Sequence, residues 1–397
     1  MDMAKQFLLS FFVRAKKRGG PACNAGAFLA TSLCTQRSSI KKSIKMEISK
    51  KGQKMLDKYN RIINYMIISL TDRCNLRCVY CRPEITQMVE HTQILRYEEI
   101  LRVVKCAVTL GITRFKITGG EPLVRKGAVD FIAKLKLLEG VEQVTLTTNG
   151  TLLEKNLPQL LACGIDGINI SLDTLDKDLY KHITGGGDVE AVIKAIKAVV
   201  QTGIKCKINC VPIKNSYVNN SVNVDKLSPL HNGTKVDNLS QSQTNIVEFA
   251  GSLAVPLRFI ELMPLACNGN LSSYSGTEIR EILYNAGYEL RPLKESFGNG
   301  PAVYYEASKA GHAQIIGFIE PLHGKFCASC NRVRLTSTGQ LKPCLYSQST
   351  SDLRQLLRSS ASEEELVEAL KDVIYHKPLG HHFEEKPATF NMNEIGG

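Results

Sequence analysis

The sequence of 397 residues predicts an α/β fold, namely an incomplete (β/α)6 TIM-like barrel with a smaller C-terminal α+β domain. Strand-like and helix-like segments alternate between residues 65 and 264, which is typical of a parallel sheet covered by helices. Polar motifs follow nearly every predicted strand at its C-terminal end, where barrel active sites are built. A doubly wound open sheet is the alternative, because it also gathers ligands at the C-terminal ends of its strands.

Each predicted strand is a short apolar or β-branched segment that ends at a polar motif, as buried parallel strands do. In chain order, the predicted strands are residues 65–70, 114–118, 143–148, 167–173, 204–213 and 256–264. The helices between them carry apolar residues at helical spacing, and three of them end at a glycine. The predicted helices are residues 96–111, 127–138, 157–164 and 189–203.

The pattern changes near residue 266, which divides a predicted barrel (55–265) from a predicted C-terminal domain (266–397). The C-terminal part contains a helical segment at 276–290, short strands, and a second helical segment at 363–376. Short strands mixed with helices are typical of an α+β unit. We expect this smaller domain to complete the open barrel.

Residues 215–245 interrupt the barrel pattern with seven Asn, five Ser and no sustained apolar periodicity. Segments of this composition bury too little apolar surface to offset the entropy of ordering. The sequence therefore predicts a low-complexity insertion in the barrel that forms a disordered surface loop.

The net charge of +12 is concentrated at the N-terminus, because residues 1–54 hold twelve Lys/Arg and two acidic residues. This basic, Ser-containing segment resembles an organelle transit peptide, and a disordered basic tail is the alternative. We therefore expect a mitochondrial (matrix) location. The charges of the remaining chain nearly balance, so no nucleic-acid partner is expected. No apolar run approaches the ~20 residues of a membrane-spanning helix, so no membrane span is expected.

The segment "TDRCNLRCVYC" places three cysteines within eight residues, at Cys74, Cys78 and Cys81. Three thiolates leave one iron of a cubane [4Fe-4S] cluster open to bind and activate a small molecule. A zinc site of three cysteines and one histidine is the alternative, with His91 as the nearest histidine. The next predicted strand ends in "GGEP" (119–122), whose glycines allow the backbone to approach a ligand closely. The two motifs together favour the iron–sulfur cluster.

A second group of three cysteines lies in the C-terminal part, at Cys327, Cys330 and Cys344. A zinc knuckle is one alternative to a second open cluster, and a fully ligated accessory cluster with Cys267 as the fourth ligand is another. In the adjacent "NRVR", Arg332 and Arg334 point the same way from an extended segment. Their guanidinium groups suit phosphate oxygens, and a solvated charge pair is the alternative interpretation.

The first cysteine motif, with Tyr80 before its last cysteine and GGEP one βα unit later, resembles the radical S-adenosylmethionine superfamily. This resemblance implies a barrel of the radical S-adenosylmethionine type, in which the open iron binds S-adenosylmethionine. Reductive cleavage of the sulfonium then gives a 5′-deoxyadenosyl radical. With "TTNG", "SLD", "RFIELMP", "CNRVRL" and the terminal Gly396-Gly397, the chain from about Tyr59 onward resembles the GTP 3′,8-cyclase family, also called molybdenum cofactor biosynthesis protein A.

The family resemblance implies a lyase that converts GTP to (8S)-3′,8-cyclo-7,8-dihydroguanosine 5′-triphosphate, the first step of molybdenum cofactor (molybdopterin) biosynthesis. Two [4Fe-4S] clusters and S-adenosylmethionine are the implied cofactors, and the second cluster holds the guanine base. The radical abstracts hydrogen from the ribose 3′ carbon, which then bonds to purine C8. The implied partners are an electron donor of unknown identity, the downstream cyclic pyranopterin monophosphate synthase and a second copy in a homodimer.

The resemblance also assigns roles to single residues beyond the six cysteines. The residues implied to contact S-adenosylmethionine are Tyr80, Gly119, Gly120, Glu121, Ser171 and Met263. Those implied to contact GTP are Lys116, Thr147, Lys207, Arg332, Val333 and Arg334. Those implied to act in catalysis are Arg332, Arg334, Gly396 and Gly397, with the tail reaching into the active site.

Three positions depart from the family pattern. Ile67 and Lys116 stand where the family has arginine, and Arg82 follows the last cysteine in place of methionine. Lys116 keeps the positive charge but loses the bidentate fork of arginine. We expect the loss at Ile67 to remove a phosphate contact, for which Arg82 is a candidate replacement.

Two other functions compete with this interpretation. One is a different twin-cluster radical S-adenosylmethionine enzyme that matures peptides, and the other is a non-enzymatic metal-binding scaffold. The peptide-maturing enzymes usually carry more cysteines than the three found here after residue 300, and they lack the Gly-Gly end.

Overall fold

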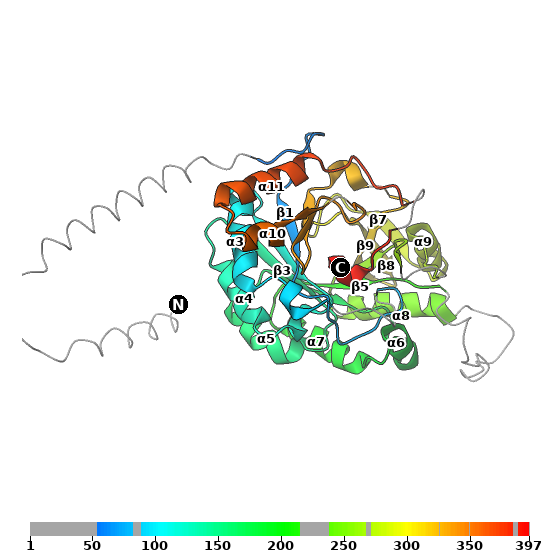
Figure 1. Cartoon of the computed structure of the whole chain (residues 1–397). Coiled ribbons are helices and arrows are strands. Elements are labelled where there is room, and N and C mark those ends of the chain that lie inside the picture. The colour runs from blue at the N-terminus through cyan, green and yellow to red at the C-terminus, as the bar shows by residue number, and fades with distance from the viewer. Residues whose placement is uncertain are drawn as a thin grey trace, which may run out of the picture. The chain divides into compact units, whose positions relative to one another are not determined.

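A curved sheet of twelve strands forms the centre of the described structure (Figure 1). The computed structural model describes residues 54–81, 89–214, 238–266, 271–324, 326–348, 350–383 and 388–396, all within one compact unit. Arg82, Cys267, Gly397 and the predicted leader up to residue 53 lie outside the described residues. The strand order in the sheet is β12-β11-β10-β1-β2-β3-β4-β5-β6-β9-β8-β7.

The six predicted barrel strands all form, and they pair in parallel in chain order. Their apolar residues are almost fully buried, as expected for strands with helices on one side and a filled interior on the other. They are β1 (Tyr65–Ser69), β2 (Arg114–Thr118), β3 (Gln143–Thr148), β4 (Gly167–Ser171), β5 (Cys206–Cys210) and β6 (Leu257–Ile260).

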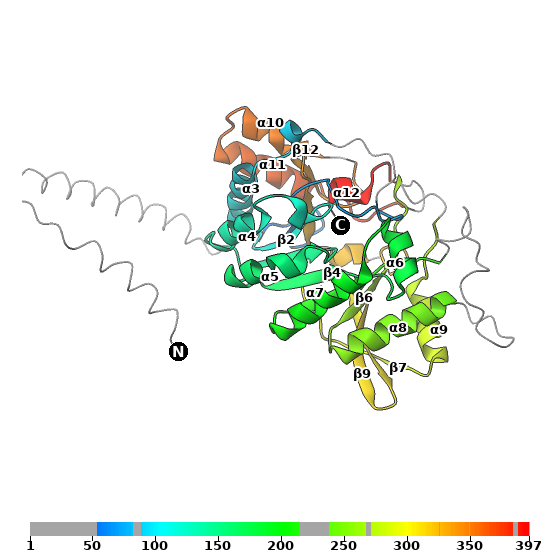
Figure 2. The same cartoon turned by 90° about the horizontal axis from the view of Figure 1, so that it is seen from below.

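Amphipathic helices cover the outer face of this sheet, as Figures 1 and 2 show from two directions. They are α3 (Tyr97–Thr109), α4 (Ala128–Lys136), α5 (Leu153–Ala162), α6 (Lys177–Thr184), α7 (Val189–Gln201) and α8 (Asn238–Ser252). The sequence analysis did not predict α6. It begins at Asp176, whose Oδ1 accepts a hydrogen bond from Leu179 N at 2.7 Å, and it ends at Gly185 in the left-handed conformation.

Two C-terminal strands extend the parallel sheet at both of its ends. β9 pairs in parallel with β6, and β10 pairs in parallel with β1. The remaining strands add antiparallel edges, and short helices follow them. The C-terminal elements are α9 (Gly276–Asn285), β7 (Glu289–Pro292), β8 (Val303–Lys309), β9 (His312–Ile319), β10 (Arg332–Leu335), β11 (Gln340–Lys342), β12 (Ser351–Asp352), α10 (Leu353–Arg358), α11 (Glu363–Tyr375) and α12 (Met392–Ile395).

The barrel is incomplete, because β9 and β10 do not pair with each other within the described residues. The connection between them therefore runs from one end of the parallel sheet to the other, and it carries Cys327 and Cys330. The predicted incomplete α/β barrel is confirmed. The sheet continues past residue 265, since β9 adds to β6, so the division into domains at this point stays a prediction.

The prediction of a disordered loop over 215–245 is wrong for its last eight residues, which belong to α8. Residues 215–237 lie outside the described residues. The polar side chains that suggested disorder are buried and bonded by tertiary contacts: Ser242 Oγ lies 2.9 Å from Thr174 Oγ1, and Gln243 Oε1 accepts from Cys210 Sγ. Tertiary packing supplied partners that the composition alone does not reveal.

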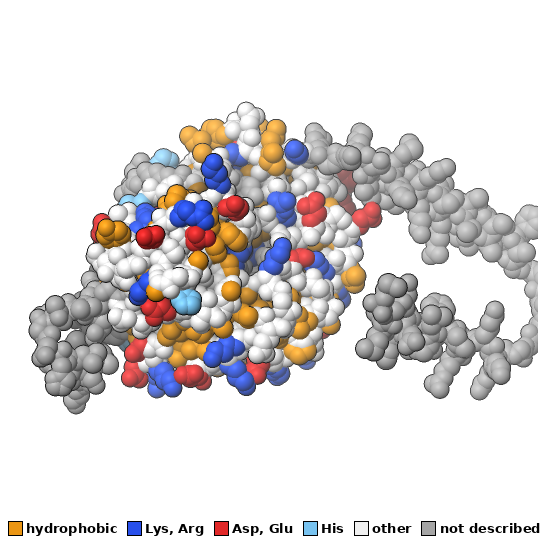
Figure 3. Space-filling model, turned by 180° about the vertical axis from the view of Figure 1, so that it is seen from behind, with side chains coloured by type: hydrophobic (Ala, Val, Ile, Leu, Met, Phe, Trp, Pro, Cys, Tyr) orange, Lys and Arg blue, Asp and Glu red, His pale blue; other side chains and the backbone are white. Residues whose placement is uncertain are grey.

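The surface of the described unit carries charges of both signs. On the face shown in Figure 3, basic and acidic side chains lie interspersed, in line with the nearly balanced charge of the chain after its basic leader. In the part of the chain that the structure describes, no helix is both long and apolar enough to cross a membrane.

Candidate active site

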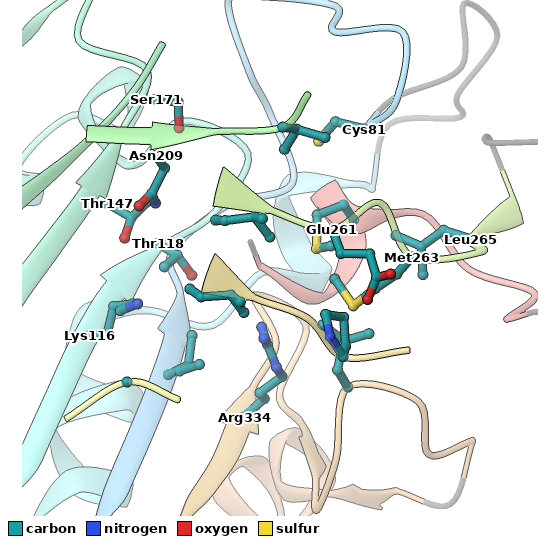
Figure 4. A pocket seen from close by; sticks show the side chains of 18 of the residues that line it. Cys81, Lys116, Thr118, Thr147, Ser171, Asn209, Glu261, Met263, Leu265 and Arg334 are labelled. Carbon is teal, nitrogen blue, oxygen red and sulfur yellow. The ribbon is translucent and has the colours of Figure 1, made fainter. Parts of the chain in front are cut away.

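One cavity inside the barrel is lined by both groups of cysteines (Figure 4). The first cysteine set (Cys74, Cys78 and Cys81) and the second cysteine set (Cys327, Cys330 and Cys344) all line it, and none of the six forms a disulfide. His91 does not line the cavity. No three His, Cys, Asp or Glu side chains among the described residues are arranged to hold a single metal ion. The cavity therefore brings the two predicted cysteine groups together.

The cavity wall is built from the strand residues that point inward. Tyr65 and Ile67 of β1 line the cavity, whereas Met66 and Ile68 belong to the hydrophobic core. Toward the C-terminal ends of β2, β3 and β4 the inward side chains are small hydroxyls, shown in Figure 4: Thr118, Thr147 and Ser171. These hydroxyl groups add polar positions to an interior that apolar side chains such as Ile67 also line.

The loop of the first cysteine set is held in shape by neighbouring backbone. Arg77 N donates to Thr184 O at 2.8 Å, and Val79 N donates to Ile183 O at 2.9 Å, so the end of α6 supports the loop. Asn149, from the TTNG motif, donates to Asn75 Oδ1 at 2.9 Å. The loop is thus preformed by contacts with two neighbouring βα connections.

The glycines of GGEP are needed because this segment packs directly on the loop that leads to Cys74. Gly120 N donates to Thr71 O at 2.6 Å, and Glu121 N donates to Arg73 O at 2.8 Å. A Cβ atom on Gly120 would lie 2.3 Å from Arg73 O, and one on Gly119 would lie 2.7 Å from Thr71 O. Only residues without a side chain allow this approach.

We expect Gly120→Ala to displace the loop of the first cysteine set and to destabilise the protein by about 1–3 kcal/mol, the usual range for overpacking. Thermal unfolding and the iron content after anaerobic reconstitution measure both effects. Gly251→Ala is the matched control, because its Cβ would meet its nearest neighbour at an ordinary 3.6 Å. Equal iron loading in the two variants would contradict this explanation of the glycines.

Glu121, predicted to contact S-adenosylmethionine, is bonded to neighbouring loops, and the predicted contact stays a prediction. Its carboxylate is buried, does not line the cavity, and accepts hydrogen bonds from Leu123 N, Thr148 Oγ1 and Asn149 N at 2.7–3.0 Å. Burial raises the pKa of Glu121 to about 7. The carboxylate therefore ties GGEP to the TTNG motif, and its oxygens are occupied by this chain's own donors.

Tyr80 reaches from the first cysteine loop to the SLD motif, where its hydroxyl donates to Asp173 Oδ2 at 2.7 Å. Burial raises the pKa of Asp173 to about 6. The same cavity is lined by Tyr80, Asp173, Ser171, Met263 and the first cysteine set. The sequence analysis quoted SLD but did not single out Asp173.

The two cysteine sets lie in different electrostatic surroundings. Burial, followed by the neighbouring Cys81 and Asp173, raises the pKa of Cys78 well above its usual value. Burial also acts to raise the pKa of Cys330, but the charges of Arg332 and Lys377 outweigh it and lower that pKa to about 7. Burial raises the pKa of Cys327 in the same set, so the preference for the thiolate form is specific to Cys330.

Four strand cations line the cavity without a carboxylate partner among the described residues: Lys116, Arg258, Arg332 and Arg334. Burial, followed by the charges of Arg258 and Arg332, lowers the pKa of Lys116 well below its usual range. Burial also lowers the pKa of Arg334 to about 10. Uncompensated buried cations are costly, so this group indicates a site for a strongly anionic ligand.

Arg258 is the cation that sequence reasoning missed, although its motif "RFIELMP" had been noted. Its guanidinium is buried and donates to Asn209 Oδ1 at 2.6 Å and to Asn169 Oδ1 at 2.7 Å. These two amides fix the side chain on neighbouring strands but do not neutralise its charge. The only signal in the sequence was an arginine placed in an otherwise buried strand.

The C-terminal segment enters the same cavity region, as Figure 1 shows at the centre of the sheet. Arg334 Nη1 donates to Gly396 O, and Asn393 Nδ2 donates to Asp72 O at 3.3 Å. A Cβ atom on Gly396 would lie 2.6 Å from Thr118 Oγ1, and the residue has a φ of +80°. Glycine is therefore required where the tail passes the ends of β1 and β2.

Most of the predicted residues meet in this cavity, and a few do not. Tyr80, Gly119, Gly120, Ser171, Met263, Lys116, Thr147, Arg332 and Arg334 line it together with the six cysteines. The predicted residues Glu121, Lys207, Val333 and Gly396 do not line it, although Gly396 O accepts a hydrogen bond from the lining residue Arg334. The side chain of Val333 is part of the hydrophobic core, so only its backbone is available to a ligand in the cavity.

The fold is shared with SuiB of Streptococcus suis, which is 16% identical. The likeness covers 94% of this chain and 77% of that chain with a TM-score of 0.51, and the score is 0.53 for SuiB bound to the precursor peptide SuiA. Residues 68–217 match the model of the radical SAM superfamily. The barrel and its cysteine loop are those of a radical S-adenosylmethionine enzyme, a class that implies a [4Fe-4S] cluster and S-adenosylmethionine.

Residues 255–383 match the model described as Molybdenum Cofactor Synthesis C. The GTP 3′,8-cyclase of Thermodesulfovibrio yellowstonii is 39% identical over 348 residues, which cover 86% of this chain and 100% of the relative. The GTP 3′,8-cyclase of Clostridium botulinum strain Langeland is 39% identical over 349 residues with the same coverage. The chain belongs to the GTP 3′,8-cyclase family.

Proposed function

We propose that this chain is a lyase that converts GTP to (8S)-3′,8-cyclo-7,8-dihydroguanosine 5′-triphosphate, the first step of molybdenum cofactor biosynthesis. The observation that carries the proposal is one cavity in which two sets of three cysteines, none of them in a disulfide, lie together with buried cations that have no carboxylate partner among the described residues. Three thiolates on each side suit two [4Fe-4S] clusters with one open iron each. When bound, the clusters and S-adenosylmethionine supply a hydrogen-abstracting radical and a ligand position for the guanine base.

The strand cations hold the triphosphate in this proposal. A triphosphate carries about three to four negative charges, which desolvated cations stabilise far better than water-exposed ones do. Three different strands supply these charges, with Lys116 on β2, Arg258 on β6, and Arg332 and Arg334 on β10, so the phosphate chain is held from several sides. Clamping at the phosphates and at the base fixes the ribose between the two cysteine sets, as a radical step on one carbon requires.

A small apolar cluster borders the cavity, and in this proposal it limits the access of water. Leu265, Phe383 and Ala388 are buried there, and Phe390 and Met392 of the C-terminal segment pack on them. Leu265, Phe383 and Met392 also line the cavity. The tail thus contributes both Gly396 and part of the apolar cover. Water exclusion protects a reactive intermediate from side reactions.

The cations disfavour the peptide-maturing alternative, because a neutral peptide would leave them buried without a counter-charge. Relatives at 39% identity over their full length are GTP 3′,8-cyclases, whereas SuiB shares the fold at 16% identity. A metal-binding scaffold without activity would not need a preformed anion site beside both cysteine sets.

Iron and sulfide analysis after anaerobic reconstitution tests the proposed cofactors. We expect about eight irons per chain for two cubane clusters. Zinc alone would contradict the proposal, and about four irons would restrict it to the first cysteine set.

Replacing Ile67 with arginine is expected to tighten GTP binding. Ile67 is buried in the cavity wall, in register with Arg334 on one side and Lys116 on the other. A further cation at this point adds a phosphate contact of about 1.5–3 kcal/mol but repels its neighbours when GTP is absent. We therefore expect Ile67→Arg to lower the melting temperature without GTP and to show a larger rise on adding GTP.

Thermal shift titrations with GTP measure both effects, and Ile67→Leu, which adds no charge, is the control. Weaker GTP binding by Ile67→Arg than by Ile67→Leu would show that this position does not face the phosphates. Arg82, the residue expected to compensate for Ile67, lies outside the described residues.

The remaining expectations concern the setting of the enzyme. The basic leader supports a mitochondrial matrix location, where oxygen-sensitive clusters find a reducing environment. Dimerisation, transfer of the product to cyclic pyranopterin monophosphate synthase and an external electron donor follow from the family resemblance. Import of a fusion of residues 1–54 to a reporter into mitochondria tests the location.

A further inference from the structure

Two buried cations outside the cysteine motifs hold the segments of the second cysteine set by their backbone carbonyls. Arg61 Nη1 donates to Cys327 O at 2.8 Å. Lys377 Nζ donates to Arg332 O at 2.9 Å and also to Pro343 O. One of these carbonyls belongs to Cys327 itself, Arg332 lies two residues after Cys330, and Pro343 directly precedes Cys344. The two cations therefore hold the backbone beside all three cysteines of the second set.

Arg61 also fixes the chain segment that carries Lys377. Its Nη2 donates to Pro378 O at 2.6 Å, and its Nη1 donates to Leu379 O at 2.9 Å. The guanidinium is itself anchored by Asp57, whose Oδ2 lies 2.6 Å from Arg61 Nε. The Arg61 side chain therefore joins three parts of the chain. These are the segment that contains Asp57, the segment after α11, and the second cysteine loop.

The charge of Lys377 is not balanced by the described protein. The side chain is 1% exposed, lines the cavity, and forms no ion pair with a described carboxylate. Carbonyl dipoles satisfy its hydrogen bonds but not its charge, and an isolated ammonium in such a position is costly. A cluster ligated by three thiolates carries the negative charge that this site lacks.

We propose that Arg61 and Lys377 are positioning residues that hold the second cysteine set in its ligating shape and that Lys377 tunes the cluster bound there. This inference rests on the second cluster of the proposed function. Arg61 holds the loop by its hydrogen bonds to backbone carbonyls. Its charge has little further effect on the cluster, because it is already paired with Asp57. Lys377 acts through both geometry and charge, and a nearby positive charge stabilises the reduced state of a cluster.

The test compares reconstituted full-length variants by iron content and by redox titration followed with electron paramagnetic resonance. In Lys377→Met we expect either loss of the second cluster, leaving about four irons of about eight, or a retained cluster whose potential is lower than in the wild type. In Arg61→Lys we expect reduced loading of the second cluster with no change in the potential of the loaded fraction. Lys371→Met, which removes an exposed lysine of α11 paired with Glu368, is the control and should match the wild type.

Eight irons and unchanged potentials in both Lys377→Met and Arg61→Met would overturn the inference. A wild-type protein with only about four irons would instead overturn the second cluster and with it the proposed function. Retention of the first cluster, seen as reductive cleavage of S-adenosylmethionine, shows that a variant has folded. If Lys377→Met does not fold, the milder Arg61→Lys decides the question, since full loading in that variant also overturns the inference.

Discussion

Replacing Cys327 with alanine is expected to abolish formation of the cyclised nucleotide while S-adenosylmethionine is still cleaved. Cys327 belongs to the second cysteine set, and the first set is held by separate contacts from α6 and the TTNG motif. Removing one of three thiolates leaves too few ligands for an open cluster. Without that cluster the guanine base is no longer held, and the near-attack geometry that can be worth ~7–11 kcal/mol is lost.

The measurement is an anaerobic reaction with reductant, S-adenosylmethionine and GTP, in which 5′-deoxyadenosine and cyclised nucleotide are quantified together. Cys106→Ala is the matched control, because Cys106 is buried between α3 and α11 and does not line the cavity. Cyclised nucleotide at wild-type rates from Cys327→Ala would show that the second cysteine set does not bind the substrate.

Replacing Arg258 with methionine is expected to weaken GTP binding by about 10- to 100-fold. A hydrogen bond to a charged group contributes about 1.5–3 kcal/mol, and each 1.4 kcal/mol changes affinity tenfold. Arg258 is held in place by Asn169 and Asn209 before any ligand binds, so no ordering of this side chain reduces its contribution. Arg258→Lys keeps the positive charge but loses the bidentate guanidinium group. Its affinity for GTP should therefore lie between those of the wild type and Arg258→Met.

Isothermal titration with GTP and the separation of KM from kcat measure the effect of Arg258. The control is Arg280→Met, since Arg280 is also partly buried but pairs with Glu320 at 3.3 Å away from the cavity. An affinity for GTP that is unchanged in Arg258→Met but lowered in Arg280→Met would place the phosphates elsewhere.

Local patterns in the sequence predicted the fold and most of the site. The six strands from β1 to β6 form where apolar segments end at polar motifs, because both features depend on burial of a parallel sheet. The two cysteine sets were visible as spacing, and the placement of motifs at strand ends predicted a site at the first set. That the second set shares this site was implied only by the family resemblance. Val333 could be assigned only a backbone role, which its buried side chain fits.

Contacts between distant segments could not be predicted. Nothing local shows that β9 and β10 add to opposite ends of the sheet, because strand order depends on the whole topology. The helix over 238–252 lies in a polar segment, since Ser242 and Gln243 find partners on other elements. The carboxylate of Glu121 is likewise turned from the cavity toward the TTNG motif, because Asn149 of that motif donates a hydrogen bond to it.

Buried cations show most clearly that contacts between distant segments cannot be predicted from local sequence. In the sequence, Arg61 and Lys377 look like ordinary surface residues, because charged side chains are usually exposed. Arg258 differs only in being an arginine within an otherwise apolar strand. Their burial becomes evident only when Asn209, Asp57 and the carbonyls of the second cysteine loop are brought around them. A cation buried for a ligand has no periodic signature, because the ligand is not part of the sequence.

The most direct test of the proposed function uses GTP carrying deuterium at the ribose 3′ carbon. Under anaerobic conditions with reductant and S-adenosylmethionine, we expect the deuterium to move to 5′-deoxyadenosine. An equal amount of cyclised nucleotide should form that carries no deuterium and has the mass of unlabelled GTP, because the reductant supplies one electron and the solvent one proton after cyclisation. Formation of 5′-deoxyadenosine that carries no deuterium, does not depend on GTP and is accompanied by no cyclised nucleotide would contradict the assignment of this chain as a GTP 3′,8-cyclase.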